Sequence, residues 1–217
     1  MKKKVIVLLT VLVMVFLTGC GMSEEEAKAY VEASLDASYM GEFDAFVEIT
    51  DSTPEGAAAM YDENIEHIME AAGFSDQNLD EELTKNYKQL FLDLIKRVDY
   101  TVGEAVKGEN DSFTIDVTVK PMTILNGIEE ELIQVLLDRI EGLDELPDED
   151  EIRVMGFEEM YKILSEKVDS PKYSEETIVV TINLHKNDEG MYAISEEDML
   201  ALDNALFAVE EIDTEAE

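Results

Sequence analysis

The stretch VDYTVGEAVKGENDSFTIDVTVKP, residues 98–121, decides the fold because apolar and polar side chains alternate along it with a period of two. The alternation runs from Val98 to Val102 and again from Phe113 to Val119, on either side of the turn-like GEND at 108–111. Successive side chains of a strand point to opposite faces, so this pattern predicts an antiparallel hairpin with one buried face. Pro121 ends the second strand because proline has no N–H to donate.

Apolar residues before this hairpin recur every three to four positions, which is the spacing of amphipathic helices. Ser23 and Glu26 have the spacing of a capping box, so a first helix is expected from there to about Tyr39, with Gly41 ending it. Three further helices are expected around the following apolar residues: Phe43, Phe46 and Val47; Tyr61, Ile65, Ile68, Met69 and Ala72; and Leu83, Tyr87, Leu90, Phe91 and Leu94.

The chain after the first hairpin repeats the order of helices and then a hairpin. Two helices are expected around the following apolar residues: Ile128, Leu132, Val135, Leu136 and Ile140; and Met160, Ile163, Leu164 and Val168. Ile178–Leu184 alternates as a strand, residues 187–190 offer a turn that contains glycine, and Met191–Ile194 returns as a short strand. Ser195 and Asp198 have the spacing of a capping box for a last helix.

This order of elements predicts an α+β fold, in which an antiparallel sheet of about four strands, arranged as two hairpins, packs against several helices. Apolar residues recur at regular spacings throughout, which indicates one folded domain over residues 23–212. The dense acidic run at 144–151 is too short to link two domains. We expect the acidic tail at 213–217 to be disordered.

The N-terminus has the three-part order of a secretory signal peptide. Lys2–Lys4 precede an apolar run, Val5–Leu17, and small residues follow it. As a helix this run of about 13 residues would rise only about 20 Å, which is less than the roughly 30 Å of a bilayer's hydrocarbon core. We therefore expect residues 1–19 to be a cleaved signal peptide and not a membrane-spanning anchor.

The apolar run ends close to the only cysteine of the chain. The tetrapeptide LTGC at 17–20 resembles the lipobox of bacterial lipoproteins, in which the cysteine receives a diacylglycerol and becomes the new N-terminus. The resemblance implies lipidation of Cys20, a lipid-anchored N-terminus at 20–22, and an exported protein at the outer face of the cell membrane. The alternative is an ordinary signal peptide with a coincidental cysteine. Because two residues alone separate Cys20 from the first helix, the domain is expected to sit close to the bilayer.

The charge of the chain excludes one class of partner. The chain has 52 acidic and 16 basic side chains, and removal of the three leader lysines leaves 13 basic side chains and a formal charge of −39. Nucleic acid is excluded because its phosphates require a basic surface. An anionic membrane surface also repels this domain, so the predicted lipid must hold it there.

Few residues offer catalytic or metal-binding chemistry. His67 lies among glutamates on a polar helix face, and His185 lies beside a turn, where solvated histidines are more common than metal ligands. The acidic run at 144–151 offers oxygen ligands, but it lacks the glycine and the terminal glutamate of an EF-hand, which favours a solvated loop. Paired carboxylates cannot be chosen by spacing among so many acids, and no nucleophile or phosphate-loop motif is present. The sequence therefore assigns no catalytic, cofactor-binding or metal-binding residue, and Cys20 is the one site that it predicts.

Two segments carry a resemblance to a known family: YVEASLDASYMGEFDAFVEIT at 30–50 and TIVVTINLHKNDEGMYAISEEDMLALDNALF at 177–207. With the hairpin between them, they resemble a broad group of uncharacterised lipoproteins from Gram-positive bacteria. Some domains of that group are similar to NTF2-like or cystatin-like folds, with a curved sheet around a long helix, and the resemblance implies such a fold here. Tyr192 stands where related sequences often have tryptophan, and the helices between the two hairpins depart from the NTF2-like pattern. The resemblance implies no activity.

The function that these features predict is a non-enzymatic module that binds a small ligand, a peptide or a protein partner at the outer membrane surface. The alternatives are a cell-envelope hydrolase that uses paired carboxylates and a divalent-cation-dependent binder. Converging acids with a raised carboxyl pKa in a deep pocket would favour the enzyme. An exposed apolar surface would favour a partner-binding protein.

Overall fold

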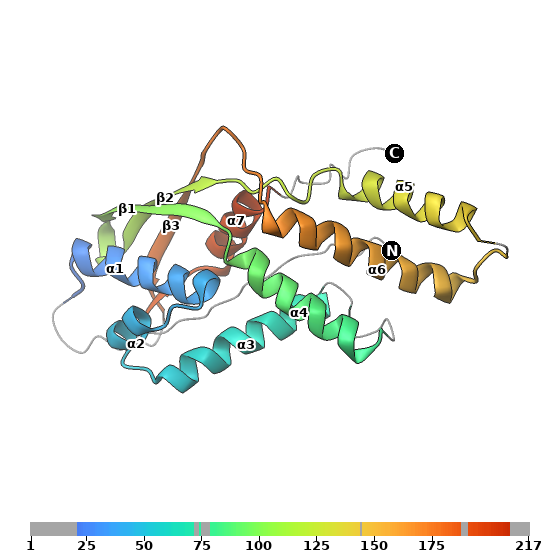
Figure 1. The fold of residues 1–217 in the computed structure, drawn as a ribbon. Helices are drawn as coiled ribbons and strands as arrows, with labels where there is room; N and C mark the ends of the chain where they lie inside the picture. Colours follow the sequence, from blue (N-terminus) through green and yellow to red (C-terminus); the bar gives the residue numbers. More distant parts are fainter. Residues whose placement is uncertain (1–20, 72–73, 75–78, 144, 188–190, 209–217) are drawn as a thin grey trace.

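A four-stranded sheet forms the centre of the fold, and helices lie on one side of it (Figure 1). The computed structural model describes residues 21–71, 74, 79–143, 145–187 and 191–208. The helices are α1 (Glu24–Leu35), α2 (Asp44–Thr50), α3 (Pro54–Ala71), α4 (Glu81–Ile95), α5 (Ile128–Glu141), α6 (Glu149–Asp169) and α7 (Glu196–Leu206), and the strands are β1 (Asp99–Lys107), β2 (Phe113–Lys120), β3 (Ile178–Lys186) and β4 (Tyr192–Ile194). These elements confirm the predicted α+β class and its two hairpins.

The strands pair in the order β1-β2-β3-β4, and every neighbouring pair is antiparallel. A β-bulge between Val102 and Ala105 interrupts the pairing of β1 with β2. Gly103 lies in this bulge, where a Cβ would come within 2.8 Å of the carbonyl oxygen of Asp116. Only glycine fits so close an approach of two backbones.

One face of β2 provides the centre of the core. Its four apolar side chains are completely buried, and the residues between them are exposed: the buried residues are Phe113, Ile115, Val117 and Val119. α1 packs across β1, and α7 packs across β3 and β2, so helices from opposite ends of the described chain cover this face. The hydroxyl of Tyr39, just after α1, donates a hydrogen bond to the carboxylate of Asp203 on α7 over 2.7 Å. Burial raises the pKa of Tyr39, which keeps the hydroxyl protonated as a donor.

The helix boundaries confirm one predicted cap and correct another. Ser23 and Glu26 form the complete capping box, and the helical run that they start continues as a π-helix, Asp36–Met40, until Gly41 at φ +68°. The capping box predicted at Ser195 is only half formed. The Ser195 hydroxyl accepts a hydrogen bond from the backbone N–H of Asp198 over 3.0 Å, but the Asp198 side chain does not return one to Ser195. The Asp198 carboxylate accepts instead from the backbone N–H of Asn183 over 2.9 Å, at the residue where β4 no longer covers β3.

The acidic run at 144–151 also needs a correction. It is not a loop throughout, because α6 begins at Glu149 and its first turn is acidic. Asp148 caps this helix and exchanges reciprocal hydrogen bonds with Glu151, and negative charge is favourable at a helix N-terminus. α6 is therefore 21 residues long and extends well before the apolar residues that predicted it.

Several predictions fall on residues that the structure does not describe. These are the signal peptide at 1–19, the lipidated Cys20, the turn residues 188–190 and the tail at 213–217. Across the described part of the chain, no helix is both long and apolar enough to span a membrane. The resemblance to NTF2-like or cystatin-like folds stays a prediction.

The buried face of β2 gives the first testable prediction. Ile115→Ala removes a completely buried side chain from the central strand pair and should lower the free energy of unfolding by about 2–5 kcal/mol. Thr118→Ala, on the exposed face of the same strand, should change it by less than about 1 kcal/mol. Urea denaturation measures both, and equal losses would contradict the one-sided burial of the sheet.

Candidate functional site

α5 and α6 form an antiparallel helical hairpin that extends away from the sheet (Figure 1). α5 packs mainly on α6, and α6 packs on α4. Neither helix of the hairpin has a major contact with the sheet. The hairpin is thus joined to the domain through α4 and leaves much of its own surface open.

An aromatic cluster holds the middle of α6 against α4. The rings of Phe157 and Tyr161 on α6 pack on Tyr87 of α4, and Phe74 contacts both Tyr87 and Phe157, with ring centroids 4.4–6.1 Å apart. The Tyr87 hydroxyl donates to the carbonyl oxygen of Phe157 over 2.6 Å. Burial raises the pKa of Tyr87, so the hydroxyl remains a donor. This cluster makes the middle of α6 part of the folded core.

Ion pairs join α5 to α6 in the middle of the hairpin. Arg139 on α5 binds Glu158 over 2.9 Å and Glu159 over 2.6 Å, and Lys162 binds Glu159 over 2.8 Å. The Glu159 side chain is only 12% exposed, and the hydrogen bond from Lys162, with help from Arg139, lowers the pKa of this carboxyl group despite its burial. Its negative charge therefore persists at neutral pH as part of the link between the helices.

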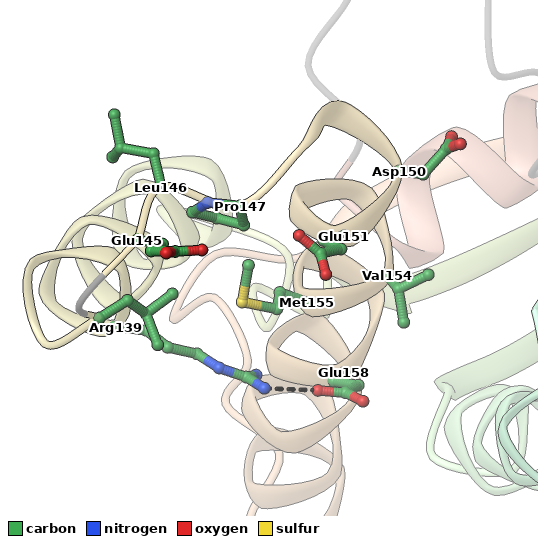
Figure 2. Close-up of a pocket in the computed structure, with 10 residues that line it drawn as sticks. Arg139, Glu145, Leu146, Pro147, Asp150, Glu151, Val154, Met155 and Glu158 are labelled. Atoms are coloured by element: carbon green, nitrogen blue, oxygen red, sulfur yellow. Dashed lines mark ion pairs between the residues drawn. The ribbon is translucent and has the colours of Figure 1, made fainter.

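The tip of the hairpin contains an open groove of about 640 Å³ (Figure 2). It is lined by the end of α5, the connecting loop and the first turns of α6: Arg139, Leu143, Glu145, Leu146, Pro147, Asp150, Glu151, Val154, Met155 and Glu158. Leu146 is 86% exposed and points outward from the groove in Figure 2. The groove is therefore lined by both apolar side chains and several carboxylates.

Apolar exposure on the hairpin continues beyond this groove. Ile133 and Leu137, one helical turn apart on α5, are 51% and 53% exposed, and Leu143 and Ile152 are also exposed. With Leu146, these residues are half of the ten large apolar side chains that are exposed in the described chain. We call these five residues the apolar tip surface: Ile133, Leu137, Leu143, Leu146 and Ile152.

Acidic residues surround the apolar tip surface. Residues 128–158 contain 12 acidic and two basic side chains, a formal charge of −10. Both arginines are engaged within the hairpin, Arg139 as described and Arg153 with Asp150 over 2.7 Å. The surface around the apolar side chains is consequently strongly negative.

A second groove, of about 530 Å³, lies between α1 and β1 and is polar. Three of its ionisable groups have partners, since Lys28 binds Glu104 and the Tyr100 hydroxyl donates to Asp36, each over 2.6 Å. Burial raises the pKa of Tyr100. Three of its nine lining residues are apolar, Met40, Val98 and Val102, whereas most ligand sites are lined mainly by apolar side chains, so this groove is a weaker candidate.

The sequence-predicted candidates do not converge on a metal or catalytic site. His67 is exposed and lies 4.0 Å from Glu70, and His185 is also exposed. Among the residues that the structure describes, no group of three or more histidine, cysteine, aspartate and glutamate side chains is placed to hold a metal ion. Cys20 lies outside these residues.

Sequence reasoning missed the apolar tip surface. The packed face of α5 was indicated by Leu132, Val135 and Leu136. Another face of the same helix carries Ile133 and Leu137. Two leucines inside an acidic connection, Leu143 and Leu146, gave a second signal. Loops and turns are usually polar, and a surface helix usually has one polar face. Apolar residues in this loop and on both faces of α5 could therefore have indicated a contact surface.

Comparison with known proteins supports the fold alone. No family model and no curated protein matches the chain. A solved structure that is similar is that of a "putative lipoprotein (ycdA)" from Bacillus subtilis, with a TM-score of 0.57 and 16% sequence identity. The match covers 84% of this chain and 56% of that chain, so this chain spans little more than half of its neighbour's length. The expected resemblance to lipoproteins thus extends to a shared fold.

The link at Glu159 predicts a pH dependence of stability. Glu159→Gln removes the buried charge that Lys162 and Arg139 bind, so the variant should unfold at a lower urea concentration than the wild type at pH 7. Because the folded-state pKa lies below the ordinary 4.5, the wild type loses this contribution as the pH falls through that lower value. The two stability curves should approach each other below about pH 4.5.

The matched control is Glu166→Gln, an exposed position on the same helix, which should leave stability nearly unchanged at either pH. A difference between wild type and Glu159→Gln that stays constant from pH 7 to pH 3 would contradict the ion-pair interpretation.

Proposed function

We propose that this protein is a lipid-anchored extracytoplasmic binding protein and that its α5–α6 hairpin binds a protein or peptide partner. The observation that carries the proposal is the apolar tip surface, five large apolar side chains exposed on a hairpin that has no major contact with the sheet. Exposed apolar side chains gathered on one element are typical of interaction sites.

The energy available from this surface is considerable. Complete burial of one leucine or isoleucine side chain is worth about 1.5–3 kcal/mol. Leu146 has most of this energy still available because it is 86% exposed, and the other four residues, which are 37–53% exposed, keep about half or less of it. A partner that covers several of them can offset the loss of translational and rotational freedom on binding.

The N-terminus of the described chain supports a short anchor. Met22 is only 2% exposed, and a Cβ on Gly21 would lie 3.4 Å from the Asp111 carboxylate, beside the β1–β2 turn. The proposed lipid on Cys20 would therefore hold this end of the sheet at the bilayer. The tip of the α5–α6 hairpin lies at the opposite end of the molecule (Figure 1), so the apolar tip surface would face away from the membrane.

Lipidation of Cys20 predicts the mass and the processing of the mature protein. Cys20→Ala removes the thiol that would be acylated, so the protein should lose the diacylglyceryl mass and should no longer be processed at residue 20. Mass spectrometry of the membrane fraction measures both. A free thiol on Cys20 of the mature wild-type protein would contradict the anchor without affecting the hairpin.

Partner binding by the hairpin is tested with Leu143→Ser/Leu146→Ser. Both side chains are exposed, so stability should change by less than about 1 kcal/mol, whereas recovery of the partner from solubilised envelopes should fall at least about tenfold. Val106→Ser is the matched control, because Val106 is also apolar and its exposure, 61%, lies between those of Leu143 and Leu146, but it lies on β1. Quantitative mass spectrometry of the proteins recovered by each variant gives the result. The same proteins in the same amounts with all three baits would contradict the proposal.

A further inference from the structure

We infer that the partner of the α5–α6 hairpin presents a cationic segment with apolar side chains, which cover Leu143 and Leu146 while its lysines or arginines face the surrounding carboxylates. This inference rests on the proposed function, because it specifies the partner for the same surface. It follows from the charges around the groove and from the occupants that those charges exclude.

The carboxylates of the groove lie beside its apolar side chains. Glu145 lies in the connecting loop and Glu151 in the first turn of α6, and both line the groove with Pro147 and Met155 (Figure 2). A segment that inserts an apolar side chain between them brings its flanking residues next to these acids. Methionine adapts its shape to different apolar partners, which suits Met155 to such a contact.

The basic residues of the hairpin do not neutralise this surface. Arg139 is held by Glu158 and Glu159, and Arg153 is held by Asp150. The formal charge of −10 over residues 128–158 already includes both arginines. Positive charge from a partner is therefore the complement that the groove lacks.

The same charge disfavours other occupants of the apolar tip surface. A second copy would bring another −10 against the first, and an anionic bilayer would also be repelled within about 8 Å at physiological salt. The tip lies at the far end of the molecule from the start of α1 (Figure 1), so the proposed lipid on Cys20 would hold it further from the membrane. A cationic segment with apolar side chains complements both the negative charge of the groove and its exposed leucines.

Two synthetic peptides test this inference on the full lipidated protein in phosphatidylcholine nanodiscs. One is a 14-residue peptide of leucine and lysine in amphipathic order, and the other has glutamate in place of every lysine. Hydrogen exchange measured by mass spectrometry locates binding along the chain. The lysine peptide should slow exchange in residues 140–156 severalfold and the glutamate peptide should not, and 0.5 M salt should weaken the effect at least about tenfold.

Matched charge variants separate the groove from the general acidity of the protein. Glu145→Gln/Asp150→Asn/Glu151→Gln should raise the peptide concentration for half-maximal protection at least about tenfold. Glu48→Gln/Glu55→Gln/Glu63→Gln removes three exposed acids from α2 and α3 and should leave it nearly unchanged. Thermal melting confirms that both variants are folded.

Three results would overturn the inference. Equal protection by the two peptides would show that charge is not recognised, and equal effects of the two triple variants would show that the groove is not the site. Absence of protection by either peptide would also reject it. The proposed function is judged separately by recovery of the native partner with Leu143→Ser/Leu146→Ser, so a partner that binds without salt dependence would reject the cationic segment and retain the hairpin as a binding site.

Discussion

The fold depends on the need to cover one apolar face of a four-stranded sheet. Every second residue of β2 from Phe113 to Val119 is completely buried, and the chain meets this demand with α1 and α7, which come from its two ends. Tyr39 and Asp203 join the segments that cover the sheet. Because these helices cover the sheet, α5 and the first half of α6 are not required for that purpose and are available for another role.

The helices of the hairpin and the loop between them differ in how they are held. Aromatic rings around Tyr87 and Phe157 hold α6 against α4, the ion pairs of Arg139 hold α5 to α6, and in the connecting loop Leu146 is almost fully exposed. Packing and ion pairs thus hold the two helices, while the loop leaves a large apolar side chain in solvent. Binding surfaces are often placed in such regions of low local stability, where side chains remain free to contact a partner.

Local rules predicted much of the fold from sequence. Alternation located β2 and β3, the Ser23 cap located α1, and Gly41 located its end, because each of these signals depends on neighbouring residues. The apolar tip surface could not be predicted in the same way, because the helical period of α5 does not reveal how many neighbours the helix has. Glu159 also illustrates this limit, since its partner Arg139 lies 20 residues away on another helix. Lipidation of Cys20 remains a prediction from its motif, and the fold adds only that Met22 is buried in the core while Gly21 is exposed beside Asp111.

The central claim is that the tip of the α5–α6 hairpin contacts a partner in the cell envelope. The most direct measurement is site-specific photo-crosslinking in living cells, with a photoreactive amino acid placed at Leu146 or, as the comparison, at Val106 on β1, which is also apolar and exposed. The account predicts a discrete crosslinked species from position 146 that is absent from position 106. The same crosslinked species from both positions, or none from position 146, would contradict it.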